Sequence, residues 1–181
     1  MPEIIAIANQ KGGVGKTTTS VNLAAALHAT GKKTLLVDLD TQGNATTACG
    51  IDKSNLEVSV YDLFVGAATA DAALVHPEAN GFWVLPANKD LMAAEIQLLE
   101  FREREFQLKQ ILAGISPRFD YVLIDTPPSM NILTINALAA SDGVIIPVQC
   151  EYYALEGLTG LLETINKIQE KWLCVITMKK I

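Results

Sequence analysis

The sequence predicts an α/β fold in which a mostly parallel β-sheet is covered by helices on both faces. Two observations predict it. Short segments rich in Val, Ile and Leu alternate with longer segments of helical periodicity. The short segments are apolar throughout, which is typical of strands buried on both faces. We expect strands at residues 4–8, 34–39, 82–85, 121–124, 144–148 and 172–177.

Three longer segments have the periodicity of helices. Residues 17–29 follow a glycine-rich turn and should end near Gly31. Residues 155–169 are amphipathic, and residues 90–112 should form one helix whose charged run 102–105 faces solvent. The apolar residues of that helix recur at Leu91, Ala94, Leu98, Phe101 and Leu108. Since crossovers between parallel strands are short and right-handed, we expect the strand at 4–8 to be central, with the 34–39 and 121–124 strands as its neighbours.

Composition narrows the class of protein. The 181 residues suit one domain, and half of them are hydrophobic, so a sizeable core is possible. The formal net charge of -6 disfavours a protein whose whole surface grips nucleic acid. Cys49, Cys150 and Cys174 are too far apart for a metal site and are expected to be reduced thiols. No signal-like segment or membrane-length apolar run is visible, so we expect a cytoplasmic protein that does not enter a membrane.

A phosphate-binding loop is the strongest feature, and it lies between the first strand and the first helix. It comprises Lys11, Gly12, Gly13, Val14, Gly15, Lys16, Thr17 and Thr18. The glycines let backbone N–H groups turn toward a phosphate, and the following helix adds its positive end. Lys16 can neutralise β- and γ-phosphates, and the Thr17 hydroxyl can bind Mg²⁺. The alternative is a chance glycine turn, but six fixed residue types give roughly 10⁻⁷ per starting position at average usage.

The loop departs from the usual G-x-x-x-x-G-K-[ST] pattern at one end. Gln10 stands where the first glycine is usual, and a second lysine, Lys11, follows it. From the residues alone, Lys11 could equally be an ordinary solvated lysine.

Aspartates follow two of the expected strands. Asp125 ends the 121–124 strand, and Asp38 and Asp40 end the 34–39 strand. Carboxylates at the carboxyl ends of parallel strands point into the crevice where ligands bind. We therefore predict Asp125 as a metal-site residue and Asp40 as a catalytic residue, with turn capping as the alternative for both. Side-chain alternation would place Asp38 and Asp40 on one face.

Together these segments resemble the ParA/Soj family of chromosome and plasmid partitioning ATPases, within the MinD-like group that has a deviant Walker A P-loop. The resemblance rests on KGGVGKTTTSVNLAAAL, LLVDLDTQGNAT, DYVLIDTPPS and IIPVQCEYYALEGLTGLL, which cover most of residues 2–165. It implies a P-loop NTPase fold. It also implies that Lys11 reaches the partner's phosphates in a nucleotide-sandwich dimer, that Lys16 is the usual P-loop lysine, that Asp40 positions the hydrolytic water, and that Asp125 acts in the Mg²⁺ shell.

The resemblance further implies a weak ATPase with ATP and Mg²⁺ as cofactors. Members of the family form an ATP-dependent homodimer, coat DNA without sequence preference, associate with the nucleoid and respond to a ParB-type partner that marks a DNA site. Residues 149–157 follow a strand end and are a candidate contact in the dimer, with a buried helix start as the alternative.

Two departures from the family pattern change the expectations. Thr41 stands where the family usually has proline. The chain also ends early, so residues 1–181 are expected to be a single domain that lacks the family's C-terminal part. Since the family's basic DNA-binding residues lie mainly there, we expect this chain to bind DNA weakly or not at all. The basic residues besides Lys11 and Lys16 look scattered along the chain, for example Lys32, Lys33, Arg102, Arg104, Lys179 and Lys180.

Other classes stay open at this point. A GTPase would need Asn-Lys-x-Asp, but residues 88–91 read NKDL and precede Asp125. A membrane-bound MinD-like positioning ATPase would need a basic amphipathic C-terminal helix, for which MKKI is too short. A phosphoryl-transfer biosynthetic enzyme has no need of Lys11. An iron–sulfur relative would need bridging cysteines, and Cys49 and Cys150 are not in the expected segments. The last alternative is a non-functional truncated fragment.

Overall fold

A parallel β-sheet organises the computed structural model, which describes residues 1–149, 154–172 and 177–179. Within these residues the sheet has six strands in the order β3-β2-β4-β1-β5-β6, and every pair of neighbours is parallel. This confirms the predicted fold class. The strands are β1 (Glu3–Ile7), β2 (Thr34–Asp38), β3 (Trp83–Leu85), β4 (Tyr121–Asp125), β5 (Gly143–Ile145) and β6 (Thr177–Lys179).

The predicted neighbours of β1 are half right. β1 pairs with β4 as expected, but its other neighbour is β5, whereas β2 pairs with β3 and β4. Strand β4 is therefore inserted between β1 and β2. In its register, Asp125 lies opposite both Ile7 of β1 and Asp38 of β2. The carboxylate of Asp125 consequently lies at the centre of the edge where β1 and β2 also end.

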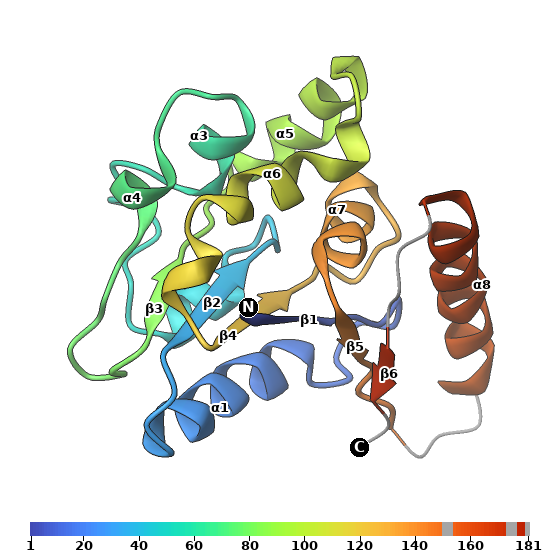
Figure 1. Ribbon diagram of the computed structural model, residues 1–181, viewed down its shortest axis with the longest axis horizontal. Coiled ribbons are helices and arrows are strands. Elements are labelled where there is room, and N and C mark those ends of the chain that lie inside the picture. Colours follow the sequence, from blue (N-terminus) through green and yellow to red (C-terminus); the bar gives the residue numbers. More distant parts are fainter. Residues whose placement is uncertain (150–153, 173–176, 180–181) are drawn as a thin grey trace.

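Helices cover both faces of the sheet (Figure 1). Helix α1 lies on one face and α3 to α7 lie on the other, with α8 beside β5 and β6. The helices are α1 (Lys16–Ala29), α2 (Asn44–Ala48), α3 (Val60–Phe64), α4 (Ala70–Ala73), α5 (Leu91–Gln97), α6 (Gln107–Ala113), α7 (Ile132–Ala140) and α8 (Ala154–Trp172), with 3₁₀ turns η1 (Leu98–Glu100), η2 (Arg104–Phe106) and η3 (Ser116–Arg118). No helix of the described residues is long and apolar enough to cross a bilayer.

Strand residues alternate between two buried clusters, because successive side chains point to opposite faces of a sheet. Ile5 and Ile7 of β1 pack with Ala24 of α1, whereas Ala6 packs into the cluster on the other face together with Leu138 of α7. Both faces are apolar, which explains why the strands read as unbroken hydrophobic runs.

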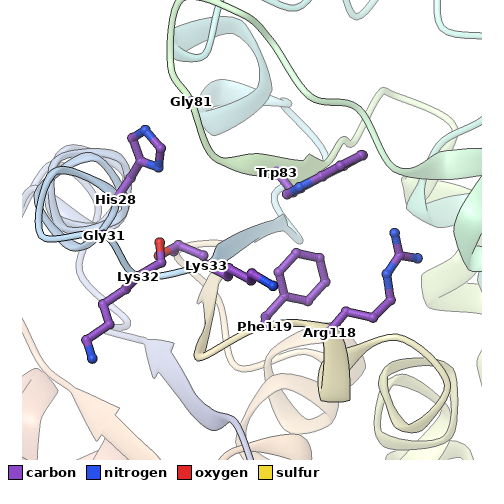
Figure 2. A pocket seen from close by; sticks show the side chains of 9 residues that line it. His28, Gly31, Lys32, Lys33, Gly81, Trp83, Arg118 and Phe119 are labelled. Atoms are coloured by element: carbon purple, nitrogen blue, oxygen red, sulfur yellow. The ribbon is translucent and has the colours of Figure 1, made fainter.

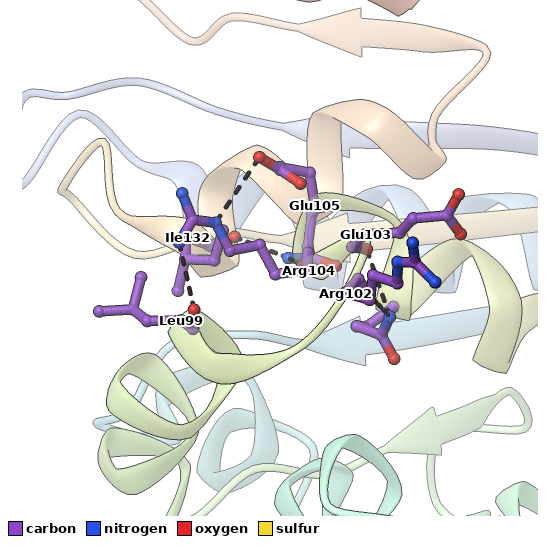
Figure 3. A network of polar contacts seen from close by, with 8 residues as sticks. Leu99, Arg102, Glu103, Arg104, Glu105 and Ile132 are labelled. Atoms are coloured by element: carbon purple, nitrogen blue, oxygen red, sulfur yellow. Dashed lines mark hydrogen bonds and ion pairs between the residues drawn. The ribbon is translucent and has the colours of Figure 1, made fainter.

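The prediction of a single helix over residues 90–112 is wrong. The chain forms α5 and η1, turns at Phe101 (ψ 142°) and Glu103 (φ 53°), and resumes as η2 and α6. Figure 3 shows the break, with Arg104 donating to the Leu99 carbonyl at 3.2 Å. The buried side chain of Asn136 stabilises this break in the helix. It accepts a hydrogen bond from the Leu108 N–H at 3.0 Å and donates one to the Arg104 carbonyl at 2.8 Å.

Two predicted strands near the C-terminus also differ. The strand predicted at 144–148 ends at Ile145, since Pro147 has no N–H to donate to a ladder. Of the strand predicted at 172–177, residues 173–176 lie outside the described residues, while Trp172 ends α8 and Thr177 begins β6. Four helices, α2, α3, α4 and α7, were not predicted; all have nine residues or fewer.

Candidate nucleotide-binding site

The loop between β1 and α1 is tied to the neighbouring strand before it reaches its glycines. The Asn9 side chain donates to the Pro147 carbonyl at 2.7 Å and accepts the Lys11 N–H at 3.0 Å. Gly13 and Gly15 then adopt φ of 75° and 90°, which disfavour any residue with a Cβ. The loop backbone is thus fixed in the conformation that turns N–H groups toward a bound anion.

Lys16 begins α1 and folds back over the loop. Its side chain is only 7% exposed, and Nζ donates to the Lys11 carbonyl at 3.2 Å. Burial lowers the pKa of Lys16, while the charges of Asp125 and then Asp40 act in the opposite direction. The ammonium group is therefore held near two carboxylates at the point where a phosphate would be received.

Asp125 connects the sheet to the first turn of α1. Its carboxylate is fully buried, accepts the Thr17 hydroxyl at 2.8 Å on Oδ2, and lies 2.8 Å from the Ser20 hydroxyl on Oδ1. Burial is the largest cause that raises its pKa to about 6, and the hydrogen bonds from Thr17 and Ser20 oppose it. Because the Thr17 hydroxyl donates its proton to Asp125, its oxygen lone pairs remain directed elsewhere, as a metal ligand requires.

Asp40 and Asp38 have different surroundings, which strand alternation did not predict. Asp38 ends β2 and is fully buried, whereas Asp40 lies beyond the strand. Asp40 accepts the Gln42 N–H at 2.9 Å and lines the same hollow as the loop. Asp38 accepts the Asp40 N–H at 3.0 Å and both the N–H and the hydroxyl of Thr46 at 2.8 and 2.7 Å. Asp38 thus holds the backbone that presents Asp40.

A hollow of about 340 Å³ opens in front of the loop, within the range of small-molecule sites. It is lined by Gly12, Gly13, Gly15, Lys16, Thr17, Thr18, Asp40, Asn44 and Pro128. Of the residues expected in the site, Lys11, Val14 and Asp125 do not line it. Val14 is buried, and Asp125 is hydrogen-bonded to Thr17, which does line the hollow.

Two lining residues were missed in the sequence analysis, Asn44 and Pro128. Asn44 donates to Asp40 Oδ2 at 3.3 Å. It follows Gly43, whose φ of 58° marks the turn that brings it back toward the loop. The sequence signal was therefore the Gly-Asn pair after the aspartates, and the Pro-Pro pair after Asp125.

The donor set at the site suits a hard cation that keeps phosphate and water ligands. The described residues contain no group of three or more His, Cys, Asp or Glu side chains that could form a metal cage. Thr17 and Asp125 instead supply one hydroxyl and one buried carboxylate, the pattern of Mg²⁺ bound mainly through nucleotide phosphates.

The segment expected to form a dimer contact is only partly visible. Residues 150–153 of the 149–157 segment lie outside the described residues. Gln149 itself donates to the Gly13 carbonyl at 3.1 Å, so the chain after β5 contacts the phosphate loop of its own subunit.

A parallel sheet with a strand–glycine loop–helix unit, a buried loop lysine and a threonine–aspartate pair defines a P-loop NTPase fold. The chain belongs to the family described as AAA domain, whose model matches residues 2–178, and within it to the ParA/Soj group. The predicted family is therefore confirmed.

Curated relatives cover nearly all of the chain. An uncharacterized protein of Pseudomonas putida is 58% identical over 93% of this chain and 64% of its own length. The sporulation initiation inhibitor protein Soj of Bacillus subtilis is 53% identical over 94% of this chain and 67% of its own length. The chromosome partitioning protein ParA of Myxococcus xanthus is 47% identical over 92% of this chain and 59% of its own length. The chain therefore spans between 59% and 67% of the length of these three relatives.

Solved structures agree on the fold. A protein named cobyrinic acid a,c-diamide synthase from Mycobacterium smegmatis, with bound ATP analog and magnesium, is 43% identical with a TM-score of 0.93, over 98% of this chain and 72% of that one. A plasmid partition protein from Borrelia burgdorferi is 30% identical with a TM-score of 0.85. The match covers 99% of this chain and 78% of that one.

The raised pKa of Asp38 predicts a pH-dependent stability. Burial raises this pKa to about 7, whereas an unfolded aspartate titrates near 4. Between these values the native chain holds a proton that the unfolded chain has released, so the free energy of unfolding falls as pH rises. The fall is a few kcal/mol at most, since one pKa unit is worth about 1.4 kcal/mol.

Urea unfolding at several pH values between 4 and 8 measures how the free energy of unfolding depends on pH. Asp38→Asn should lose stability at every pH but show a shallower fall than the wild type. The matched variant Asp90→Asn, at an exposed position, should keep the wild-type slope. Parallel curves for wild type and Asp38→Asn would show that Asp38 titrates normally.

Proposed function

We propose that the protein is a ParA-type ATPase that binds ATP with Mg²⁺, hydrolyses it slowly and acts as a switch in chromosome or plasmid partitioning. The observation that carries the proposal is the Thr17 hydroxyl, which lines the phosphate hollow while it donates to the buried Asp125. The relatives named Soj and ParA, at 53% and 47% identity, support the partitioning role.

Each site residue has a defined task in this proposal. The loop N–H groups and Lys16 bind the β- and γ-phosphates. Thr17 binds the metal, and Asp125 keeps the Thr17 hydroxyl oriented and adds negative charge behind it. Mg²⁺, when bound, neutralises charge that develops on the phosphates. Asp40, held through its N–H by Asp38, orients the attacking water.

Replacing Lys16 and replacing Asp40 should therefore have different effects on ATP affinity and on turnover. Lys16→Ala removes the cation that neutralises the transferring phosphate, so ATP binding and hydrolysis should both fall by about 100-fold or more. Asp40→Ala should leave ATP affinity within a few-fold of the wild type and reduce turnover by a similar factor of about 100. Calorimetry for affinity and phosphate release for turnover measure the two effects separately.

The control for charge loss is Lys89→Ala, at an exposed position, which should change neither quantity. Equal loss of ATP affinity in Lys16→Ala and Asp40→Ala would show that Asp40 belongs to ground-state binding and that its proposed role is wrong.

Lys11 is proposed to act across a dimer interface. It starts the phosphate loop and yet is absent from the residues that line the hollow of its own subunit. Its backbone carbonyl accepts from Lys16 Nζ at 3.2 Å. A lysine so placed suits a role toward the phosphates of a second subunit, the role that the family resemblance implies.

Dimerisation should then depend on both ATP and Lys11. Sedimentation velocity with a non-hydrolysable ATP analogue and Mg²⁺ should show a dimer for the wild type and for Lys89→Ala. Lys11→Ala should remain largely monomeric, with dimer affinity about tenfold weaker or worse, as expected for loss of a charged hydrogen bond. A dimer that forms equally well without nucleotide, or without Lys11, would contradict the nucleotide-sandwich arrangement.

Partners complete the proposal. The partners proposed for the protein are a ParB-type protein that marks a DNA site and DNA bound without sequence preference. It would work in the cytoplasm at the nucleoid. A biosynthetic enzyme is the second candidate, favoured by the name of the Mycobacterium smegmatis structure at 43% identity. Stimulation of ATP turnover by a small-molecule acceptor, without dimerisation, would favour that candidate.

A further inference from the structure

A second hollow, of about 520 Å³, lies at the ends of the strands that are opposite to the phosphate loop. Figure 2 shows the side chains that line it. Thr34 and Trp83, which begin β2 and β3, line it, as does Phe119 just before β4. The phosphate loop follows the carboxyl end of β1, and all strands are parallel, so the two hollows lie at opposite ends of the strands. They can be occupied independently.

One wall of this hollow is built by a close approach of two segments far apart in sequence. Figure 2 shows His28 of α1 facing the loop at Gly81. A Cβ at Gly81 would lie 2.1 Å from His28 Nε2, and Gly81 has a φ of 71°. Only glycine permits both the backbone turn and the contact. The exposed imidazole ring of His28 thus lies against the Gly81 backbone at the rim of the hollow.

Aromatic rings form the opposite wall and the floor. Trp83 is half-buried with the His76 ring centroid 4.8 Å from its own, and Phe119 is buried beneath. The Arg118 guanidinium lies 5.9 Å from the ring centroids of both Trp83 and Phe119, within cation–π range. These contacts restrict the motion of the aromatic side chains. Less side-chain entropy is therefore lost when a ligand stacks on them.

Positive charge gathers at the hollow although the chain as a whole has a net charge of -6. Lys32, Lys33 and Arg118 line it, and none of its nine lining residues is acidic. Figure 2 shows Lys33 directed toward Phe119 and Lys32 directed away from the rings. Nearby carboxylates offset part of this charge, since Asp71 pairs with Arg118 and Asp120 accepts the Lys33 N–H. Among the described residues, the ammonium groups of Lys32 and Lys33 take part in no ion pair.

We propose that this hollow binds a nucleotide, either free or as one unit of a single-stranded nucleic acid. Lys33 suits the phosphate, and the rings of Trp83 and His28 suit a flat base, because bases stack on aromatic side chains. The volume lies within the general range of small-molecule sites. A purely acidic ligand would use the cations and leave the aromatic wall unused.

Trp83 itself provides the reporter. The chain has two tryptophans, so Trp172→Phe leaves Trp83 as the only one. Its fluorescence should change saturably with AMP and with hexadeoxythymidylate, and less than a tenth as strongly with inorganic phosphate or adenosine at the same concentration. The response should persist in Lys16→Ala, which separates this site from the phosphate loop and keeps the test valid even if the ATPase proposal fails.

Lys33→Gln should weaken the AMP response about tenfold, the expected cost of one charged hydrogen bond, whereas Lys109→Gln at an exposed position of α6 should not. Tighter binding of hexadeoxythymidylate than of AMP identifies a strand as the ligand, and equal binding identifies a free nucleotide. No saturable response to either, adenosine acting as strongly as AMP, hexaglutamate binding as tightly as AMP, or an unchanged response in Lys33→Gln would overturn the proposal.

Discussion

The buried carboxylate of Asp125 is the constraint on which the rest of the site depends. It is fully buried at the end of β4, and hydrogen bonds to Thr17 and Ser20 connect it to the first turns of α1. Leaving such a group without partners would cost several kcal/mol. The hydrogen bonds therefore fix α1 against the sheet, and with α1 they fix the glycine loop that precedes it. The same contacts keep Thr17 oriented toward the hollow, so the packing of α1 and the proposed metal binding rest on one interaction.

A second carboxylate extends this arrangement to the neighbouring strand. Asp38 lies opposite Asp125 in the register of β2 and β4, and burial is the largest cause that raises the pKa of both groups. Asp38 accepts from Thr46, whose hydroxyl oxygen accepts the Ala87 N–H at 2.9 Å. A continuous set of hydrogen bonds thus runs from the chain after β3 through α2 to Asp40. The position of Asp40 is set by buried groups rather than by the surface turn that contains it.

Much of this was predictable from the sequence, because the relevant signals are local. Apolar runs located five of the strands to within a few residues, and the glycine pattern located the loop. The order of β2 and β4 was not predictable, since nothing local records which strand is inserted beside β1. The break near Glu103 depends on Asn136, more than 30 residues away, which supplies hydrogen bonds that a continuous helix would have made internally. The basic hollow was missed for the same reason: Lys33 and Arg118 are scattered in sequence and adjacent only in the fold.

The central claim is that the Asp125 carboxylate serves the metal-bound nucleotide and not only the packing of α1. Calorimetry of ATP binding with and without Mg²⁺, for the wild type and Asp125→Asn, tests it most directly, because the amide keeps the size of the side chain and removes its charge. The account predicts that Mg²⁺ tightens ATP binding by the wild type and has little effect on a folded Asp125→Asn protein. An equal gain from Mg²⁺ in both proteins would contradict it and leave Asp125 a structural residue alone.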